Sequence, residues 1–287
     1  MNGSYLRYVG WVLSDATTQV RLEAVKALSG VYAQGDYIGS FNLFTERFKP
    51  RLIEIAEGDT ELAVRVAVIQ VLEAIDGHSL LEEEERDQLC LLIFDEEPKV
   101  RKAVSTFVKG AWQESVEERM AGRKLSAEDK SRVGVKALAG LLVKWGKALS
   151  QQGEHDSEDN GSDDASAGTS RTNLREARVL GLSKKGRIAH VVEALWDALD
   201  SVSDWEGLLD VLLLDHSSAR DDAERSEEGR MNGEENDEDS VVDEAWRLDE
   251  MEEGILLEVL LAALSYAKAE AAGGKKVRHL SSSGGVC

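Results

Sequence analysis

One short motif, an Asp followed five residues later by Val-Arg, occurs three times in the first third of the chain. The copies start 44 and 36 residues apart. After each Val-Arg pair, apolar residues recur at steps of four, four and three, which places them on one face of a helix. The copies are Asp15 with Val20-Arg21, Asp59 with Val64-Arg65 and Asp95 with Val100-Arg101, and the three apolar series are Val20, Ala24, Leu28, Val31; Val64, Val68, Leu72, Ile75; and Val100, Val104, Val108, Ala111.

A period of about 40 residues, with an Asp before a helix and an Arg inside it, is typical of HEAT-type helical repeats. The Asp can accept hydrogen bonds from the free N–H groups at the helix start, and the Arg can reach an acid of the neighbouring repeat. We therefore predict an all-α fold, a curved HEAT-repeat α-solenoid of about five helix pairs. Coincidence among amphipathic helices is the alternative, which three matched copies disfavour.

Two acidic segments interrupt this pattern. Residues 154–164 hold six acids and no base, and residues 215–253 hold 17 acids and four arginines, so together they carry nearly all of the net charge of -21. Both lack the apolar periodicity that would offset the entropy of ordering, and we predict disordered acidic inserts at 153–170 and 217–244. The other expected parts are three repeats at 1–119, connecting helices at 120–152, HEAT-like helices at 171–216, a terminal helix or helices at 245–272 and a disordered tail at 273–287.

Helices outside the motif are expected at further amphipathic stretches. They are Ser4–Leu13, Phe41–Ala56, Glu82–Phe94, Ser126–Ser150, Asn173–Asp200, Trp205–Leu214 and Ala245–Ala272.

Signals for catalysis, metals and membranes are weak. The five histidines are far apart, the two cysteines have no metal-ligand spacing, and no phosphate-binding or nucleophile-elbow motif is present. The start of the chain lacks the pattern of a signal peptide, and the most apolar late segment is short and interrupted by Glu258. We expect a binding scaffold, not an enzyme, with no cofactor, no metal and no membrane partner.

Two segments of the first repeats resemble a known domain. Ser4-Tyr5-Leu6-Arg7-Tyr8-Val9-Gly10-Trp11 and Leu43-Phe44-Thr45-Glu46-Arg47-Phe48-Lys49-Pro50-Arg51, with the Asp15 repeat between them, are similar to the stromalin conservative domain of the stromal antigen family, the HEAT-repeat subunit of cohesin. The likeness runs over about the first 110 residues, and segments around Trp196, Trp205 and Leu257 also look similar. Members of the family are several-fold longer, so the resemblance implies a fragment or a truncated chain.

The resemblance implies a cohesin subunit of the nucleus and chromosomes that acts in sister chromatid cohesion. Such a subunit docks on the kleisin chain, is linked through it to the ring ATPase subunits, helps to hold DNA and receives aromatic-containing regulator peptides. The family's peptide groove falls here on Tyr8, Trp11, Arg47 and Phe48, with Arg7 where many members have Lys. Gly3 stands where an acid often precedes the first motif. A HEAT adaptor of another system, such as a transport receptor or a phosphatase scaffold, is the alternative.

These residues also fit a binding site on physical grounds. Tyr8 and Trp11 are three apart and share a helix face, while Arg47 and Phe48 lie on the first helix of the next repeat, which solenoid stacking places alongside. Aromatic residues beside an Arg are typical of binding hot spots. The competing hypothesis is that Tyr8, Trp11 and Phe48 are ordinary core between repeats.

A basic cluster lies between the two acidic segments. It is a candidate for sequence-independent contact with DNA phosphates or for an import signal, and a solvated helix face is the alternative. Its members are Arg171, Arg175, Arg178, Lys184, Lys185 and Arg187.

Overall fold

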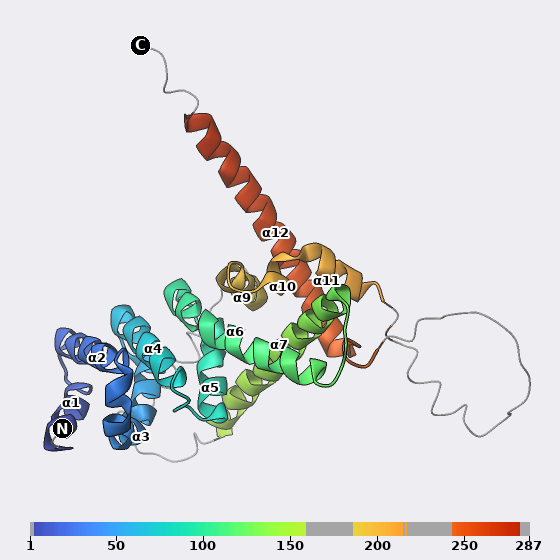
Figure 1. The fold of residues 1–287 in the computed structure, drawn as a ribbon. Coiled ribbons are helices and arrows are strands. Elements are labelled where there is room, and N and C mark those ends of the chain that lie inside the picture. The colour runs from blue at the N-terminus through green and yellow to red at the C-terminus, as the bar shows by residue number, and fades with distance from the viewer. Residues whose placement is uncertain (1–2, 159–185, 215, 217–242, 282–287) are drawn as a thin grey trace, which may run out of the picture. The chain divides into compact units, whose positions relative to one another are not determined.

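The structure is a computed structural model that describes residues 3–158, 186–214, 216 and 243–281 (Figure 1). Every regular element in these ranges is a helix. The chain divides into two compact units, one formed by residues 1–111 and 145–198 and the other by residues 112–144 and 199–287. No helix in the described ranges combines the length and hydrophobicity needed to cross a membrane.

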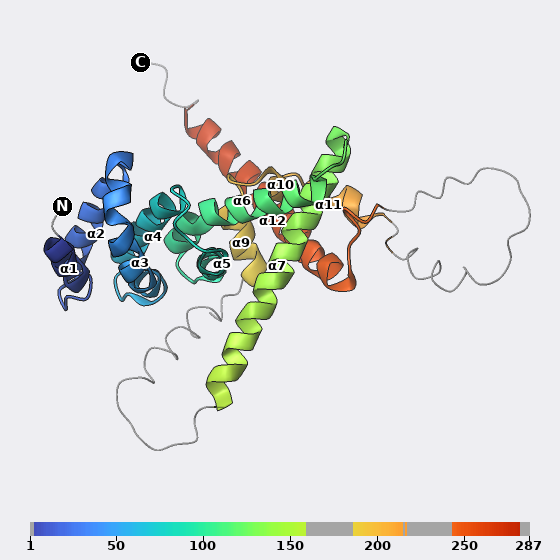
Figure 2. The same ribbon diagram turned by 60° about the horizontal axis from the view of Figure 1, so that its bottom comes forward.

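The first unit begins with three helix pairs, which are coloured blue to green in Figures 1 and 2. In each pair the second helix carries the repeated motif. The pairs are α1 (Gly3–Val12) with α2 (Thr18–Tyr32), α3 (Gly35–Gly58) with α4 (Leu62–Asp76), and α5 (Glu83–Cys90) and the 3-10 helix η1 (Leu91–Phe94) with α6 (Pro98–Met120).

The predicted apolar faces form the core of the second and third repeats. Val64, Val68, Leu72 and Ile75 of α4 are fully buried, as are the three valines of the series in α6. The first repeat differs, because Val20 is exposed and α2 instead buries Arg21, Val25 and Tyr32 beside Ala24 and Leu28. The buried face of α2 therefore overlaps the predicted face at Ala24 and Leu28 but is rotated about the helix axis towards Arg21.

The motif Asp accepts a hydrogen bond at the entry to each second helix, but from the residue just before the helix and not, as predicted, from the N–H groups of its first turn. In each copy its Oδ1 accepts a hydrogen bond from the backbone N–H two residues on, at 2.7 to 2.9 Å. This bond satisfies one N–H group at the entry to the second helix. The acceptors are Asp15 before α2, Asp59 before α4 and Asp95 before α6.

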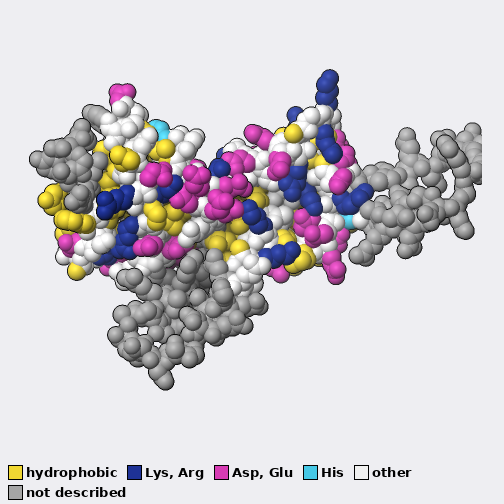
Figure 3. All heavy atoms as spheres, turned by 90° about the horizontal axis from the view of Figure 1, so that it is seen from below, with side chains coloured by type: hydrophobic (Ala, Val, Ile, Leu, Met, Phe, Trp, Pro, Cys, Tyr) yellow, Lys and Arg dark blue, Asp and Glu magenta, His cyan; other side chains and the backbone are white. Residues whose placement is uncertain are grey.

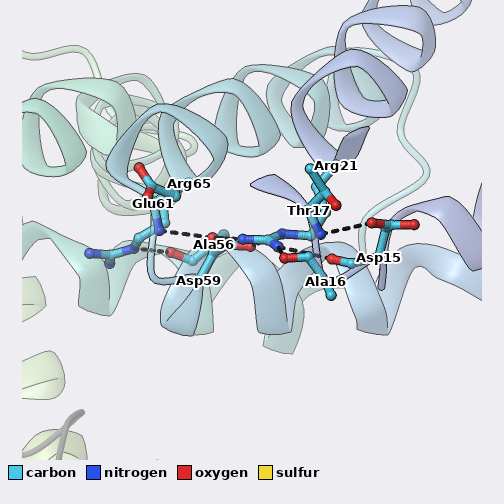
Figure 4. A network of polar contacts seen from close by, with 8 residues as sticks. All are labelled: Asp15, Ala16, Thr17, Arg21, Ala56, Asp59, Glu61 and Arg65. Atoms are coloured by element: carbon cyan, nitrogen blue, oxygen red, sulfur yellow. Dashed lines mark hydrogen bonds and ion pairs between the residues drawn. The ribbon is translucent and has the colours of Figure 1, made fainter. Parts of the chain in front are cut away.

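The motif Arg links each repeat to the next, as predicted. Arg21 donates two hydrogen bonds to the carboxylate of Asp59, both 2.8 Å long, and one to the carbonyl of Asp15 (Figure 4). Arg65 repeats the arrangement with the carboxylate of Asp95 at 2.5 and 3.3 Å, and its Nε donates to the carbonyl of Ala56. A ladder of Arg–Asp pairs thus runs through the three repeats.

The ladder changes at its third step. Arg101 is buried and donates to the carbonyls of Asp95 and Glu96, as Arg21 does to its own loop. Its Nη2 contacts Nδ1 of His190 at 3.4 Å in α9 (Arg187–Leu195), which packs on η1, and its Nε has no hydrogen-bond partner among the described residues. Burial lowers the pKa of Arg101, although Glu193 opposes that shift. A histidine therefore stands where the earlier steps have an aspartate.

The second unit packs part of α7 (Ala127–Glu158) with α10 (Asp200–Ser203), α11 (Trp205–Leu212) and α12 (Glu250–Ser281). Lys136 of α7 forms an ion pair with the buried Glu252, whose carboxylate also accepts a hydrogen bond from the backbone N–H of Asp249, just before α12. Arg132 donates to Asp210 of α11 at 2.9 Å, and the pKa of Arg132 is raised by this bond. Polar contacts thus tie α7 to both later helices.

Several boundaries differ from the sequence expectations. Helix α3 starts six residues earlier than expected, at Gly35, and continues through Pro50. Helix α7 extends to Glu158, inside the expected first acidic insert, and α12 begins at Glu250 and extends to Ser281, inside the expected tail. Four alanines between residues 267 and 272 favour the continuation of α12. The expected helix Asn173–Asp200 starts outside the described residues, and its described part is divided into α9 and α10.

Candidate partner-binding site

The candidate site begins with an exposed aromatic pair on α1. The rings of Tyr8 and Trp11 meet edge to face, with centroids 5.3 Å apart and planes at 87°. The two residues are 58% and 60% exposed, so neither is core between the described repeats. A pair of large aromatic side chains held against each other in solvent offers a partner apolar area at little cost in side-chain entropy.

Helix α3 contributes an aromatic row that ends at Phe48. Buried Phe44 packs on Phe41, and the ring of Phe48 lies 4.6 Å from that of Phe44. Phe48 itself is half-buried. The row therefore connects the core of the second repeat with the surface.

Gly10 of α1 makes the contact between α1 and α3 possible. A Cβ atom at position 10 would lie 2.0 Å from two carbons of the Phe48 ring, which is far inside van der Waals contact. The ring of Phe48 therefore lies directly on the backbone of α1 at Gly10. In the sequence, Gly10 stands between Tyr8 and Trp11. No other residue type leaves this space free.

Arg47 supplies the charge of the site. Its side chain is exposed, its guanidinium carbon lies 5.7 Å from the centroid of the Phe48 ring, and no carboxylate of a described residue forms an ion pair with it. A guanidinium stacked on an aromatic face keeps its N–H groups available for a carboxylate or a backbone carbonyl of a partner. By contrast, Lys49, two residues further along α3, is buried and forms bonds within the fold.

Lys49 is held by the third repeat. Its Nζ donates to the carbonyl of Leu80 at 3.0 Å and pairs with Glu85 at 2.9 Å. Burial acts to lower the pKa of Lys49, but the bond to Glu85 and the nearby Glu46 and Glu82 outweigh it, and the pKa is raised. This cation fixes α3 against α5 and is not available to a ligand.

The sequence analysis missed Leu43 and Gly10. Leu43 lies one helical turn before Arg47 and is 88% exposed, which adds an apolar side chain to the same surface of α3. Its place in an aliphatic-aromatic run favoured a core assignment, and only the arrangement of α3 shows it in solvent. On the face in Figure 3, hydrophobic and basic side chains lie next to each other at the N-terminal end of the first unit, at the left.

The remaining predicted site residues lie mostly outside the described parts. The side chain of Arg7 is not among the described ones, and neither are Arg171, Arg175, Arg178, Lys184 and Lys185. Of the basic cluster only Arg187 is described, as the exposed first residue of α9. Among the described residues no group of His, Cys, Asp or Glu could hold a metal ion.

The fold and this surface define a class, a helical-repeat protein with an exposed aromatic-basic surface. Comparison with known proteins supports the resemblance seen in the sequence. Residues 1–49 match the family model of the stromalin conservative domain. The start of the chain is therefore similar to the stromalin conservative domain of cohesin subunits, and the resemblance found in the sequence is confirmed.

Relatives support the same assignment over a longer stretch. Cohesin subunit psc3 of Schizosaccharomyces pombe is 39% identical over 119 residues, which are 42% of this chain and 12% of that protein. Sister-chromatid cohesion protein 3 of Arabidopsis thaliana is 31% identical over 104 residues, or 36% of this chain and 9% of that protein. The chain thus spans only a small part of the length of these relatives.

A solved structure supports the fold. The cohesin subunit Scc3 from Z. rouxii matches 91% of this chain with a TM-score of 0.54 and 20% sequence identity, and 26% of that chain is covered. The predicted all-α, HEAT-type class is confirmed by this match and by the helical repeats described above.

Proposed function

We propose that the chain acts as a non-catalytic scaffold of cohesin in sister chromatid cohesion, at chromosomes in the nucleus. In this role it docks on a kleisin chain, through which it is linked to the ring ATPase subunits. The named relatives, which are cohesin subunits and a sister-chromatid cohesion protein, support the assignment. A transport receptor or phosphatase scaffold would share the Arg–Asp ladder but would not carry the stromalin domain found here.

The observation that carries the mechanism is the exposed Tyr8–Trp11 pair beside Arg47 and Phe48. A partner peptide with aromatic side chains inserts between Trp11 and Phe48, with Tyr8 at its flank. Arg47 donates to a backbone carbonyl or an acid of the peptide, and Arg7 is proposed as a further partner-binding residue from its place in the first motif. Apolar burial supplies most of the affinity, and the charge-assisted bonds of Arg47 set the orientation.

The experiment is peptide binding by fluorescence anisotropy. The probe is a labelled synthetic peptide with two aromatic residues flanked by acids, compared with the same peptide carrying alanines in place of the aromatics. Arg47→Glu is expected to weaken binding at least tenfold, because a charge-assisted hydrogen bond contributes about 1.5 to 3 kcal/mol. Lys109→Glu changes the same charge on the exposed face of α6 and serves as the matched control.

Two results would count against the site. Unchanged binding by a folded Arg47→Glu protein would place the groove elsewhere. Equal loss of binding in the Lys109→Glu control would show that only the overall charge matters. Circular dichroism of each variant separates these outcomes from unfolding.

Contact with DNA is a second proposal, supported by the basic cluster at residues 171–187. These residues contain six bases and one acid, so their net charge is +5. Binding through phosphates should be independent of sequence and should weaken steeply with salt. Reversal of the cluster charges should lower the affinity and flatten the salt dependence in an electrophoretic mobility assay. The same affinity at low and physiological salt would rule the contact out.

A further inference from the structure

Helix α11 has two apolar faces, and only one of them is covered. Leu208 and Val211 are fully buried, and α11 contacts both α10 and α12 (Figures 1 and 2). A second series, Trp205, Leu209 and Leu213, is spaced by four residues and is 39%, 39% and 75% exposed. About two turns of helix with a Trp and two leucines in solvent have the composition of a binding surface, because Trp is enriched in hot spots.

One edge of this stripe is acidic. On the helical wheel Glu206 and Asp210 follow directly beside Trp205, Leu209 and Leu213. Asp210 pairs with Arg132, whose charge is also shared with Asp129 at 3.4 Å. Glu206 is exposed and forms no ion pair with a described residue. The local charge is therefore negative, and it favours a partner with Lys or Arg along one side.

The acidic segment that follows in sequence does not match this surface. Residues 217–242 contain ten acids, three arginines and only three large apolar residues, Met231, Val241 and Val242. Such a segment repels the acidic edge and offers little to cover three large apolar side chains. Charge complementarity instead points to a separate segment that carries both leucine-type anchors and basic residues.

We propose that the Trp205–Leu209–Leu213 face is a docking site for an amphipathic helix with basic residues along one flank. The stripe spans about 12 Å of helix, which matches apolar anchors at positions i, i+3 or i+4, and i+7 of a partner helix. Lys or Arg on the flank of that helix meets Glu206 and the free lone pairs of Asp210. This site is separate from the Tyr8–Trp11 surface and does not depend on the proposed cohesin role.

The test uses the full chain and three labelled helical peptides of 18 residues. The probe has leucines on one face and lysines on the flanks, the second peptide has serines in place of the leucines, and the third has glutamates in place of the lysines. Only the first should bind measurably in fluorescence anisotropy, and Leu213→Ser should weaken it at least tenfold. Leu261→Ser, at an exposed leucine of α12 outside the stripe, is the matched control and should bind as the parent does.

Each alternative occupant has its own result. Equal binding of the serine peptide would show attraction to an acidic protein without a site, and unchanged binding by Leu213→Ser would remove the stripe from the contact. Loss of binding in Trp11→Ala, with Leu213→Ser unaffected, would place the peptide on the first unit. Self-association of the parent chain that Leu213→Ser abolishes would show that the face pairs two copies. All four results would overturn the proposal, and Leu213 is too exposed for its replacement to unfold the protein.

Discussion

At the scale of single residues, the buried charges of the ladder are expected to have a large effect on stability. Both Arg65 and Asp95 are almost completely buried, and each satisfies the other. Asp95→Ala should cost about 3 to 5 kcal/mol, because it leaves a buried guanidinium without its counter-charge. Urea denaturation followed by circular dichroism measures the change.

Asp15 provides the control for this prediction. It has the same motif position and caps Thr17 in the same way, but Arg21 contacts its backbone carbonyl and not its carboxylate. Asp15→Ala should therefore cost only the cap, about 1 kcal/mol. Equal losses for the two variants would show that the Arg–Asp pairs contribute little beyond capping.

Gly10 is expected to act on binding more than on stability. Gly10→Ala pushes the Phe48 ring away from α1, which moves the Tyr8–Trp11 pair relative to Arg47. Peptide affinity should fall at least tenfold while the melting temperature, set by the α2–α4 core, changes little. In a Phe48→Ala background the same substitution should have no further effect. An additive loss in the double variant would contradict the positioning role of Gly10.

At the scale of elements, the sequence predicted what lies within one repeat. The spacing of Asp59, Val64 and Arg65 was sufficient to predict both contacts, because Asp59 accepts from a backbone N–H two residues away and Arg65 reaches the Asp of the next copy of the motif. The partner of Arg101 was not predictable in this way. His190 is 89 residues further along and is brought near only by the packing of α9 on η1.

The candidate site shows the same limit. Tyr8, Trp11 and Arg47 were selected through the resemblance to the stromalin conservative domain, and their helical spacing and residue types are consistent with a binding site. Leu43 and Gly10 were not selected, because their roles depend on how closely α1 approaches α3. Close contacts between helices are set by packing, which the repeat pattern does not encode.

The third step of the ladder can be tested by placing an acid opposite Arg101, as in the first two steps. Nδ1 of His and Oδ1 of Asp are both two bonds from Cβ, so His190→Asp places a carboxylate oxygen where Arg101 already points. The position is also in the first turn of α9, which favours an acid. We expect a gain of about 1.5 to 3 kcal/mol in the docking of α9, seen as slower hydrogen exchange of its amides.

His190→Asn is the control, since the Asn side chain has the same shape as the Asp side chain but carries no charge. It should leave the exchange rates of α9 near those of the parent. Faster exchange in His190→Asp than in His190→Asn would mean that Arg101 is already satisfied in another way.

At the scale of the whole molecule, the net charge of -21 is unevenly distributed along the chain. Residues 154–164 and 215–253 carry nearly all of it, and both reach into described helices, whereas residues 1–53 hold six bases and four acids. A basic site such as Arg47 is therefore compatible with an acidic chain. The charge does not argue against peptide or DNA partners of the repeats.

The most direct test of the central claim, that this chain is a cohesin scaffold, is affinity purification of the tagged chain from its own cells, followed by mass spectrometry. We expect recovery of a kleisin together with the ring ATPase subunits, and reduced recovery of regulator proteins with Arg47→Glu while the kleisin remains. Recovery of a transport GTPase or a phosphatase catalytic subunit in place of the kleisin would contradict the account.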